Sequence, residues 1–331
     1  MKGCRVFRDF PLYISLLRFN KGIFMNRNQF IAFVKDVHEH PDRLPYYRQK
    51  YKNVYPFSDG IFKLLMASEG KSQRLVSFLN AMLGLKGNDV IKDFVLGVPE
   101  NPGVLNDKTA IFDIYGTTEA GKPVLIEVQQ NYNKLFFDRL LYYTARVISR
   151  TVKKSQSYGL PHIYVLSILT TNQFKKEKDT YFHHVQIVRN KEIFYKKLDI
   201  FFVEIEKFFK IEDKTPAERR EMSDRAELLR IFRAVLEEKD VSEEKMSRFL
   251  DSEFAKDVSL VGYTDEILLN EVNGMTDILY EKQGSFLDGQ DAKALEVAHN
   301  LYNQGKLTPA EISAVSGVPV KKIRRWKRKT V

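Results

Sequence analysis

The sequence contains a single cysteine and a single tryptophan among its 331 residues. One cysteine cannot form an internal disulfide bond, and it cannot supply the several thiolates of a cysteine-based zinc site. The scarcity of cysteine is typical of proteins that work in a reducing compartment. We therefore expect a cytoplasmic protein whose stability does not depend on disulfides or structural zinc.

Long apolar runs are also absent. A helix that spans a bilayer needs about 20 consecutive apolar residues, and no segment approaches that length, so we expect no membrane partner. The apolar segment at residues 10–17 is short and lacks a small-residue cleavage site, which argues against a signal peptide. Two interpretations of residues 1–24 stay open: an extension that precedes a start at Met25, or an ordinary helical arm.

Acidic residues are outnumbered, but the basic excess is unevenly distributed. The chain has 53 Lys and Arg against 43 Asp and Glu, a formal net charge of +10. Residues 321–331 contain seven basic side chains and no acid, residues 1–24 carry a net charge of +4, and residues 25–320 carry −1. A uniformly basic nucleic-acid-binding body is therefore excluded. A hydrophobic content of 44%, with 24 Phe and 16 Tyr, indicates a globular chain of about two domains.

Hydrophobic periodicity divides the chain into four segments. We expect an N-terminal extension and lead-in helix (1–50), an α/β core (51–210), a helical region (211–300) and a basic tail (301–331). Within the core, the apolar spacing predicts two helices over 59–84, strands at 91–98, 109–118 and 122–130, a helix over 134–157 and a strand at 162–171. Further strands are expected at 181–188 and 198–205. The predicted order is α-β-β-β-α-β, followed by helices.

Two acids stand out in the predicted hairpin over residues 110–130. If the turn is centred on Ala120, antiparallel pairing places Asp113 directly opposite Glu127, with Cβ atoms about 5 Å apart. Two carboxylates at that distance repel each other unless a partner offsets their charge, and Mg²⁺ prefers carboxylate oxygens. A solvated sheet face is the alternative, and the spacing alone leaves both interpretations open.

The motifs around this hairpin resemble a known family. Asp113 followed by Glu127-x-Gln129 resembles the PD-(D/E)xK nuclease motif, with Gln in place of Lys. The segments FSDGIFKLLMASEGKSQRLVSFLNAMLG, IFDIYGTTEAGKPVLIEVQQ and FFDRLLYYTARVISRTV resemble the Rpn-type (recombination-promoting nuclease) transposases over roughly residues 50–205. The resemblance implies a restriction-endonuclease-like α/β fold with a helical C-terminal extension. It also implies metal-dependent cleavage of DNA, connected with recombination or mobile elements.

The resemblance also implies roles for individual residues. Asp113 and Glu127 would bind Mg²⁺, or Mn²⁺ or Ca²⁺ in its place, and Gln129 would orient the attacking water or the phosphate. Gln129 cannot supply the positive charge of the motif lysine, and Phe112 stands where the motif has proline.

A third acid on a helix often completes such sites. Asp59 is the first choice for this catalytic and metal-binding role, and Glu69 is the second. The alternative for Asp59 is a helix N-cap, because Asp is a favoured capping residue. Lys63 would contact a phosphate, or would simply be a solvated lysine on a helix surface.

The helix predicted over residues 134–157 carries a basic stripe. Its members recur at steps of four and three residues, which places them on one helical face: Arg139, Tyr143, Arg146, Arg150 and Lys153. Such a stripe suits phosphate contacts, with Tyr143 available for base stacking. The alternative is a solvated basic face. Arg139 also matches the pattern of the family resembled.

The C-terminal segment has the outline of a helix-turn-helix. Thr308, Pro309 and Glu311 form a capping-box pattern, and a second helix begins near Val320. This second helix would present basic side chains to DNA: Lys321, Lys322, Arg324, Arg325, Lys327 and Arg328. A solubilising charged terminus is the alternative, and Trp326 is expected to be a packing anchor.

Taken together, the sequence predicts a Mg²⁺-dependent DNA endonuclease. The first alternative is a catalytically weak DNA-binding regulator that acts through the helix-turn-helix. A scaffold that binds partner proteins through its long C-terminal helices is the second alternative. DNA is the expected partner, and the sequence leaves open whether the protein is a monomer or a homodimer.

Overall fold

The computed structural model describes residues 25–98, 100–101, 110–130, 135–151, 159–305, 307–324 and 326. The chain forms two compact units, residues 1–271 and residues 272–331, and each is considered by itself. Lys153, Arg325, Lys327 and Arg328 lie outside the described residues, as do residues 1–24. Among the helices that are described, none has the length and apolarity needed to cross a bilayer.

The N-terminal part of the first unit is helical. Its elements are α2 (Arg27–Glu39), η1 (Pro41–Arg43), α3 (Leu44–Lys50), α4 (Asp59–Ala67), α5 (Ser72–Leu83) and η2 (Gly87–Asp89). The two helices predicted over residues 59–84 are confirmed as α4 and α5, and Gly70 adopts a positive φ of 79° between them. Gly84 ends α5 in the left-handed conformation that glycine favours.

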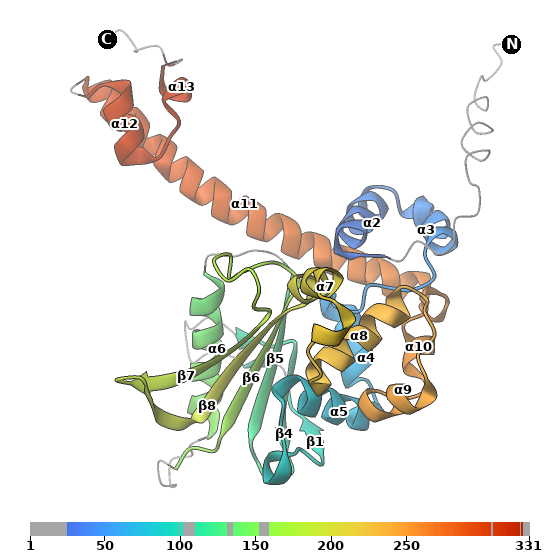
Figure 1. The fold of residues 1–331 in the computed structure, drawn as a ribbon. Coiled ribbons are helices and arrows are strands. Elements are labelled where there is room, and N and C mark those ends of the chain that lie inside the picture. Colours follow the sequence, from blue (N-terminus) through green and yellow to red (C-terminus); the bar gives the residue numbers. More distant parts are fainter. Residues whose placement is uncertain are drawn as a thin grey trace, which may run out of the picture. The chain divides into compact units, whose positions relative to one another are not determined.

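A six-stranded mixed sheet forms the centre of this unit (Figure 1). Its strands, in spatial order, are β1 (Phe94–Leu96), β4 (Ile114–Thr118), β5 (Pro123–Gln129), β6 (Ile163–Leu169), β8 (Glu192–Glu204) and β7 (Phe182–Arg189). The β5–β6 and β6–β8 pairs are parallel, and the other pairs are antiparallel. A separate two-stranded pair joins β2 (Glu100–Asn101) to β3 (Ala110–Ile111).

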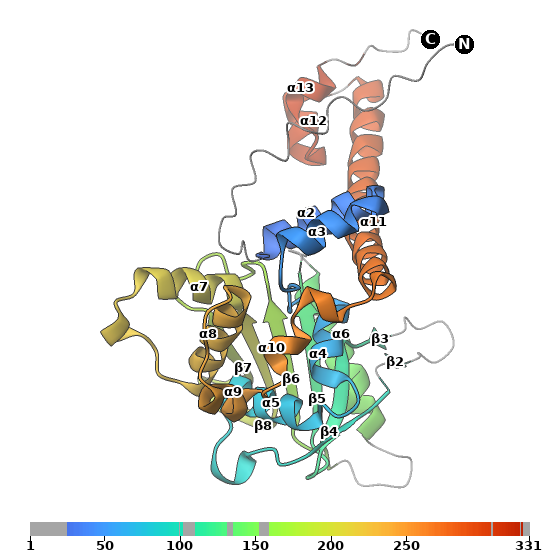
Figure 2. The ribbon, with the colours of Figure 1, turned by 90° about the vertical axis from the view of Figure 1, so that its right-hand side faces the viewer.

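Helices cover both faces of the sheet. On one face lies α6 (Phe136–Thr151), whose Phe136, Leu140 and Val147 join the buried side chains of β5, β6 and β8. On the other face lie α4, α5 and α8 (Asp224–Leu236) (Figures 1 and 2). Phe232 of α8 contacts Phe78 of α5, with ring centroids 6.2 Å apart.

The order of elements matches the predicted core. Between α5 and β6 the chain runs α5-β1-β4-β5-α6-β6, with the short β2–β3 pair inserted, so the mixed α/β class is confirmed. The strand predicted over 109–118 is wrong in one respect, because it divides into β3 and β4 at Phe112-Asp113. The strand predicted at 198–205 begins earlier, at Glu192, because it continues into a hairpin with β7.

The remaining elements are mostly helical. In the first unit they are α7 (Ile205–Lys214), η3 (Ala217–Arg219), α8, α9 (Glu243–Phe249), α10 (Phe254–Asp257), η4 (Leu260–Gly262) and the beginning of α11 (Asp265–Gln304). The second unit contains the rest of α11, α12 (Pro309–Ser316) and α13 (Val320–Ile323).

Candidate functional site

The hairpin of β4 and β5 has the predicted register. Ile114 pairs with Ile126 and Thr117 with Pro123, so opposed positions are those expected for a turn centred on Ala120. Asp113 directly precedes the first paired residue of β4, and Glu127 follows Ile126 in β5. The hairpin therefore brings the two acids to the same end of the sheet.

The break before β4 gives Asp113 a specific contact. Asp113 stands in a bend rather than in the ladder, and its Oδ2 accepts a hydrogen bond of 2.6 Å from the backbone N–H of Val128. This bond fixes the carboxylate against the residue that follows Glu127. A continuous strand would have directed the side chain away from its own sheet backbone.

The beginning of α4 adds a third acid. Asp59 is the first residue of the helix, and Ser58 occupies the N-cap position, so the N-cap interpretation of Asp59 is wrong. Lys63, one turn further along α4, has its Nζ 3.5 Å from Asp113 Oδ1. Glu69 is exposed beyond the other end of α4, so the structure does not bring the second-choice acid to this place.

Burial and mutual repulsion dominate the electrostatics of the three acids. Burial raises the pKa of Asp113 well above its ordinary value, and the charges of Glu127 and Asp59 raise it further. Burial likewise raises the pKa of Glu127, although the positive charge of Arg139 opposes the shift. Burial lowers the pKa of Lys63, but the charges of Asp113 and Asp59 outweigh burial and hold that pKa above its usual value. The site thus concentrates negative charge that its neighbours neutralise only in part.

Two carboxylate oxygens at the site are buried without compensation. Within the described part of the chain, neither Asp59 Oδ1 nor Glu127 Oε1 has a hydrogen-bond partner. Such atoms are costly to bury unless a ligand satisfies them, and carboxylate oxygens are the donors that Mg²⁺, Mn²⁺ and Ca²⁺ accept. The residues present therefore fit a hard divalent cation. Within the described ranges, no group of three or more His, Cys, Asp or Glu side chains is placed so that all of them could hold one metal ion.

Gln129 contacts the basic helix on the same side of the sheet. Its Oε1 accepts a hydrogen bond of 2.6 Å from Arg139 Nη2 of α6, and the Arg139 guanidinium also lies over the rings of Phe136 and Tyr143. The arginine charge limits the rise in the pKa of Glu127 that burial causes. Gln129 itself is uncharged, but it holds a cation beside the acids.

The rest of the predicted stripe on α6 divides between packing and exposure. Tyr143 is half-buried and lies edge-on to Phe112 of the core, with ring centroids 5.5 Å apart, so its ring is occupied by packing. Arg146 is half-buried and Arg150 is exposed near the end of the helix. Residues 139, 143 and 146 are half-buried, so this part of the stripe is not the fully solvated face that was the alternative.

Glu271 of α11 is an acid near the site that the sequence did not suggest. A Cβ built on Gly60 would lie 2.0 Å from Glu271 Oε2, so this carboxylate rests directly on the first turn of α4. Burial raises the pKa of Glu271 to about 7, and the charge of Asp59 contributes to the shift. No local pattern marks Glu271, because it lies in a charged helical segment more than 200 residues from Gly60.

The second unit contains the predicted capping motifs. Thr308 and Glu311 form the expected capping box at the start of α12, and Gly317 ends α12 with a φ of 75°. Ile312 and Ile323 are buried in one cluster, with Trp326 packed against it, as expected for a packing anchor. Lys321 and Lys322 belong to α13, which spans only four residues, and Arg324 follows it.

Comparison with known proteins gives one match. A family model described as PD-(D/E)XK nuclease family transposase matches residues 56–266, which include the sheet, α4, α6 and the acids Asp59, Asp113 and Glu127. No curated protein and no solved structure matches the chain.

Proposed function

The chain belongs to the PD-(D/E)XK nuclease family transposases, and from this premise we propose that it is a metal-dependent DNA endonuclease. The observation that supports the proposal is the pair of buried, unpartnered carboxylate oxygens of Asp59 and Glu127, as judged within the described residues. They lie beside Asp113, whose own carboxylate is held against the Val128 N–H. The expected reaction is hydrolysis of a phosphodiester bond in DNA.

Asp113, Glu127 and Asp59 are the residues that would hold the cation, with Mg²⁺ as first choice and Mn²⁺ or Ca²⁺ as substitutes. A bound divalent cation supplies positive charge to the scissile phosphate and lowers the pKa of a bound water. Asp113 is pre-positioned for this role because its Oδ2 is fixed to the strand backbone while Oδ1 faces Lys63.

Gln129 stands where the family motif has a lysine, so we propose that two other side chains supply the missing positive charge. Lys63 lies 3.5 Å from Asp113, and its raised pKa keeps it protonated at neutral pH. Arg139 is held by Gln129 through a bond of 2.6 Å. Cations placed beside a phosphate stabilise the charge that develops during hydrolysis. Gln129 would act by orienting Arg139 and the attacking water.

The duplex would contact basic side chains that border the acids. We assign phosphate contacts to Arg146 and Arg150 of α6, in addition to Lys63 and Arg139. Tyr143 is assigned to the same surface, although its ring packs on Phe112. In the C-terminal unit, the residues proposed to contact DNA are Lys321, Lys322 and Arg324, together with Arg325, Lys327 and Arg328 of the undescribed ending.

Nicking of supercoiled plasmid DNA tests the proposal. Asp113→Asn and Glu127→Gln should each lower the Mg²⁺- or Mn²⁺-dependent nicking rate by at least about 100-fold, because each removes a charge that binds the metal. Glu69→Gln is the matched control, since it removes an exposed acid beyond the far end of α4. A thermal-unfolding readout complements activity: Mn²⁺ should raise the Tm of the wild type but not of Glu127→Gln. Unchanged nicking in both site variants would contradict the assignment.

A second candidate function is DNA binding without efficient cleavage, through the C-terminal unit. The packed cluster of Ile312, Val318 and Ile323 favours it, because the cluster holds α12 and the basic α13 in a defined arrangement. Deletion of residues 306–331 separates the two candidates. Loss of DNA binding in a protein that never nicks DNA supports the regulator, whereas nicking that survives the deletion supports the endonuclease.

A further inference from the structure

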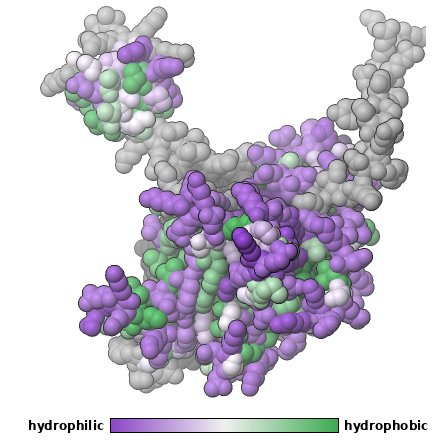
Figure 3. All heavy atoms as spheres, viewed as in Figure 1, coloured by the Kyte–Doolittle hydropathy of each residue, from purple (hydrophilic) through white to green (hydrophobic). Residues whose placement is uncertain are grey.

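A pocket of about 890 Å³, lined mainly by polar and charged residues, lies near the end of β6. Its walls come from the start of α2, the segment that follows β6, and α7, with Arg233 and Leu236 of α8. Ligand pockets in proteins commonly span about 300–1,000 Å³, and parallel sheets bind ligands at the carboxyl ends of their strands. Hydrophilic side chains dominate the face around α7 in Figure 3.

The pocket is linked to the acidic site through the backbone of β5. Thr170, which lines the pocket, donates its N–H to the carbonyl oxygen of Gln129 at 3.1 Å. Arg27, another lining residue, donates to the carbonyl oxygen of Gln130 at 2.5 Å and to Thr170 Oγ1 at 3.2 Å. Two residues that line the pocket are therefore hydrogen-bonded to the backbone at Gln129 and Gln130, just after Glu127, at the same edge of the sheet.

The inner wall of the pocket presents a buried hydrogen-bond donor. Tyr55 is 2% exposed, and among the described residues its hydroxyl makes no hydrogen bond of good geometry, although Thr170 of the same pocket lies within its reach. Burial and the charge of Glu206 raise the pKa of Tyr55, so the hydroxyl stays protonated and can donate. A buried, unsatisfied donor that lines a cavity points to a ligand that carries acceptor atoms.

Positive charge predominates around the pocket. Three lining residues are acidic, whereas six are basic: Arg27, Lys178, Lys207, Lys210, Lys214 and Arg233. Among the described residues, Arg233 pairs with Asp213 at 2.7 Å and Lys207 pairs with Glu204. Lys178 and Lys214 are exposed at the rim and come from different elements. The pocket thus offers lysine cations at its rim, and the Arg27 guanidinium and the Tyr55 hydroxyl inside.

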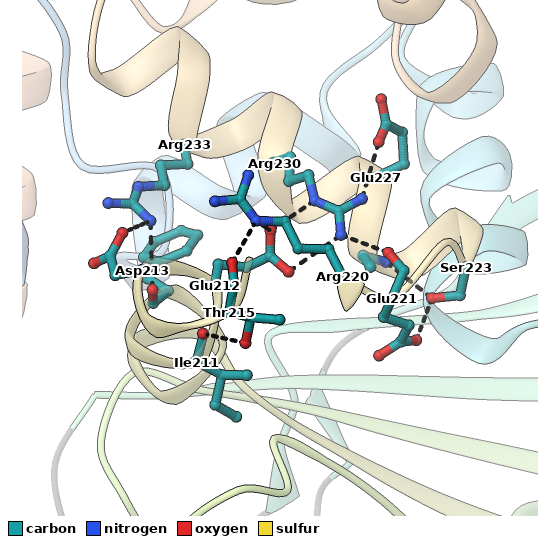
Figure 4. A network of polar contacts seen from close by, with 12 residues as sticks. Ile211, Glu212, Asp213, Thr215, Arg220, Glu221, Ser223, Glu227, Arg230 and Arg233 are labelled. Atoms are coloured by element: carbon teal, nitrogen blue, oxygen red, sulfur yellow. Dashed lines mark hydrogen bonds and ion pairs between the residues drawn. The ribbon is translucent and has the colours of Figure 1, made fainter. Parts of the chain in front are cut away.

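Salt bridges hold the α7 wall of the pocket in place (Figure 4). Arg230 of α8 contacts Glu212 of α7 at 2.8 Å, and Arg233 reaches Asp213 beside it. Glu212 is buried, and Arg220 adds a contact of 3.7 Å. Because these pairs fix α7 against α8, the pocket keeps its shape without a bound ligand.

We propose that this pocket binds a phosphate-bearing nucleotide unit of the DNA strand that leaves the acidic site. Lys178 and Lys214 would contact phosphate oxygens at the rim. Arg27 and the Tyr55 hydroxyl would meet the same unit inside. The inference rests on the proposed endonuclease function for the identity of the strand, and a free nucleotide is the other source of the same chemistry.

Binding of a fluorescent DNA duplex, measured by anisotropy with the metal chelated, tests the proposal. The double variant Lys178→Ala/Lys214→Ala should bind roughly tenfold more weakly, and the slope of log K against log salt should fall by about 2, because two phosphate contacts are lost. Asn172→Trp, which fills the pocket without changing charge, should also weaken binding. Lys196→Ala/Lys256→Ala is the matched control: it removes two exposed lysines outside the pocket and should leave affinity and slope unchanged.

The outcomes separate this inference from the function on which it rests. If the wild type nicks DNA and the pocket variants bind the duplex as tightly as the wild type, the pocket inference alone is overturned. The same holds if the control variant weakens duplex binding as much as the pocket variants do. Weakened binding in the pocket variants, in a protein that does not nick DNA, supports the pocket and contradicts the endonuclease. In a parallel titration with a deoxynucleoside monophosphate, variants that lose only this ligand and bind DNA normally would assign the pocket to a free nucleotide and overturn the strand proposal.

Discussion

At the scale of single residues, the acids at the site are buried where their charged forms destabilise the folded protein. Glu127 is 5% exposed in a strand whose seven residues are all buried, and burial raises its pKa to about 8. The pKa of an unperturbed glutamate is about 4.3. Because the folded pKa is the higher one, protonation of Glu127 stabilises the fold at low pH, and that contribution disappears as the pH rises toward 8.

Glu127→Gln should therefore stabilise the metal-free protein above neutral pH. We expect the Tm at pH 8 to rise by about 2–4 °C, which corresponds to about 1 kcal/mol for a unit of this size, and the gain to shrink at pH 5. Thermal unfolding followed by circular dichroism at both pH values, in a chelating buffer, is the measurement. Glu69→Gln, at an exposed position, should show neither effect. A lower Tm for Glu127→Gln at pH 8 would contradict the argument.

At the scale of elements, the position of β1 depends on a glycine in β4. Gly116 pairs with Leu96 of β1, and a Cβ at this position would lie 2.4 Å from the carbonyl oxygen of Val95 and 2.5 Å from the ring of Phe94. Glycine inside a strand often marks such a close approach of another backbone. The sequence IYGTT shows the glycine but not the strand that approaches it.

Gly116→Ala should destabilise the protein by about 2–3 kcal/mol. The added methyl group would collide with the backbone of β1, which can make room for it only by shifting. Urea unfolding monitored by circular dichroism gives the free energy. Thr117→Ala, at the half-buried next position, serves as the control and should cost less than about 1 kcal/mol. Equal free energies of unfolding for Gly116→Ala and the wild type would disprove the close packing of β1 on β4.

At the scale of the whole molecule, α8 and α10 of the first unit share a core with Phe57 and α5 from its N-terminal part. Phe232 of α8 contacts Phe57 at 4.9 Å, and Phe254 of α10 contacts Phe232 at 5.1 Å. Arg74 of α5 is 1% exposed and pairs with Asp251 and with Asp257, which is 2.7 Å away. The α/β core predicted at residues 51–210 thus depends on partners that lie beyond it.

A fragment of residues 51–210 should not fold cooperatively. It would lose the aromatic contacts of α8 and leave the Arg74 guanidinium buried without its carboxylates, which is strongly destabilising. Near-UV circular dichroism and dye binding to exposed apolar surface would show this. A fragment of residues 25–271 retains those partners and should unfold in one transition. Similar sharp transitions for both fragments would contradict the expectation.

Features encoded by neighbouring residues could be predicted from the sequence alone. The β4–β5 register follows from strand alternation and turn length, so Asp113 and Glu127 could be placed at the same end of the hairpin in advance. The capping box at Thr308 and the glycine end of α5 follow from backbone hydrogen bonding within one helical turn. The family resemblance, carried by ordered local motifs, is confirmed over residues 56–266.

The tertiary structure alone decided which distant residues meet. It placed Glu271 on Gly60, joined Gln129 to Arg139, turned Asp113 out of the strand toward Val128, and built the pocket from α2, the segment after β6, α7 and α8. Helical and strand periods fix only the face on which a side chain lies. Contacts between segments many residues apart arise from the packing of whole elements, which local spacing does not encode.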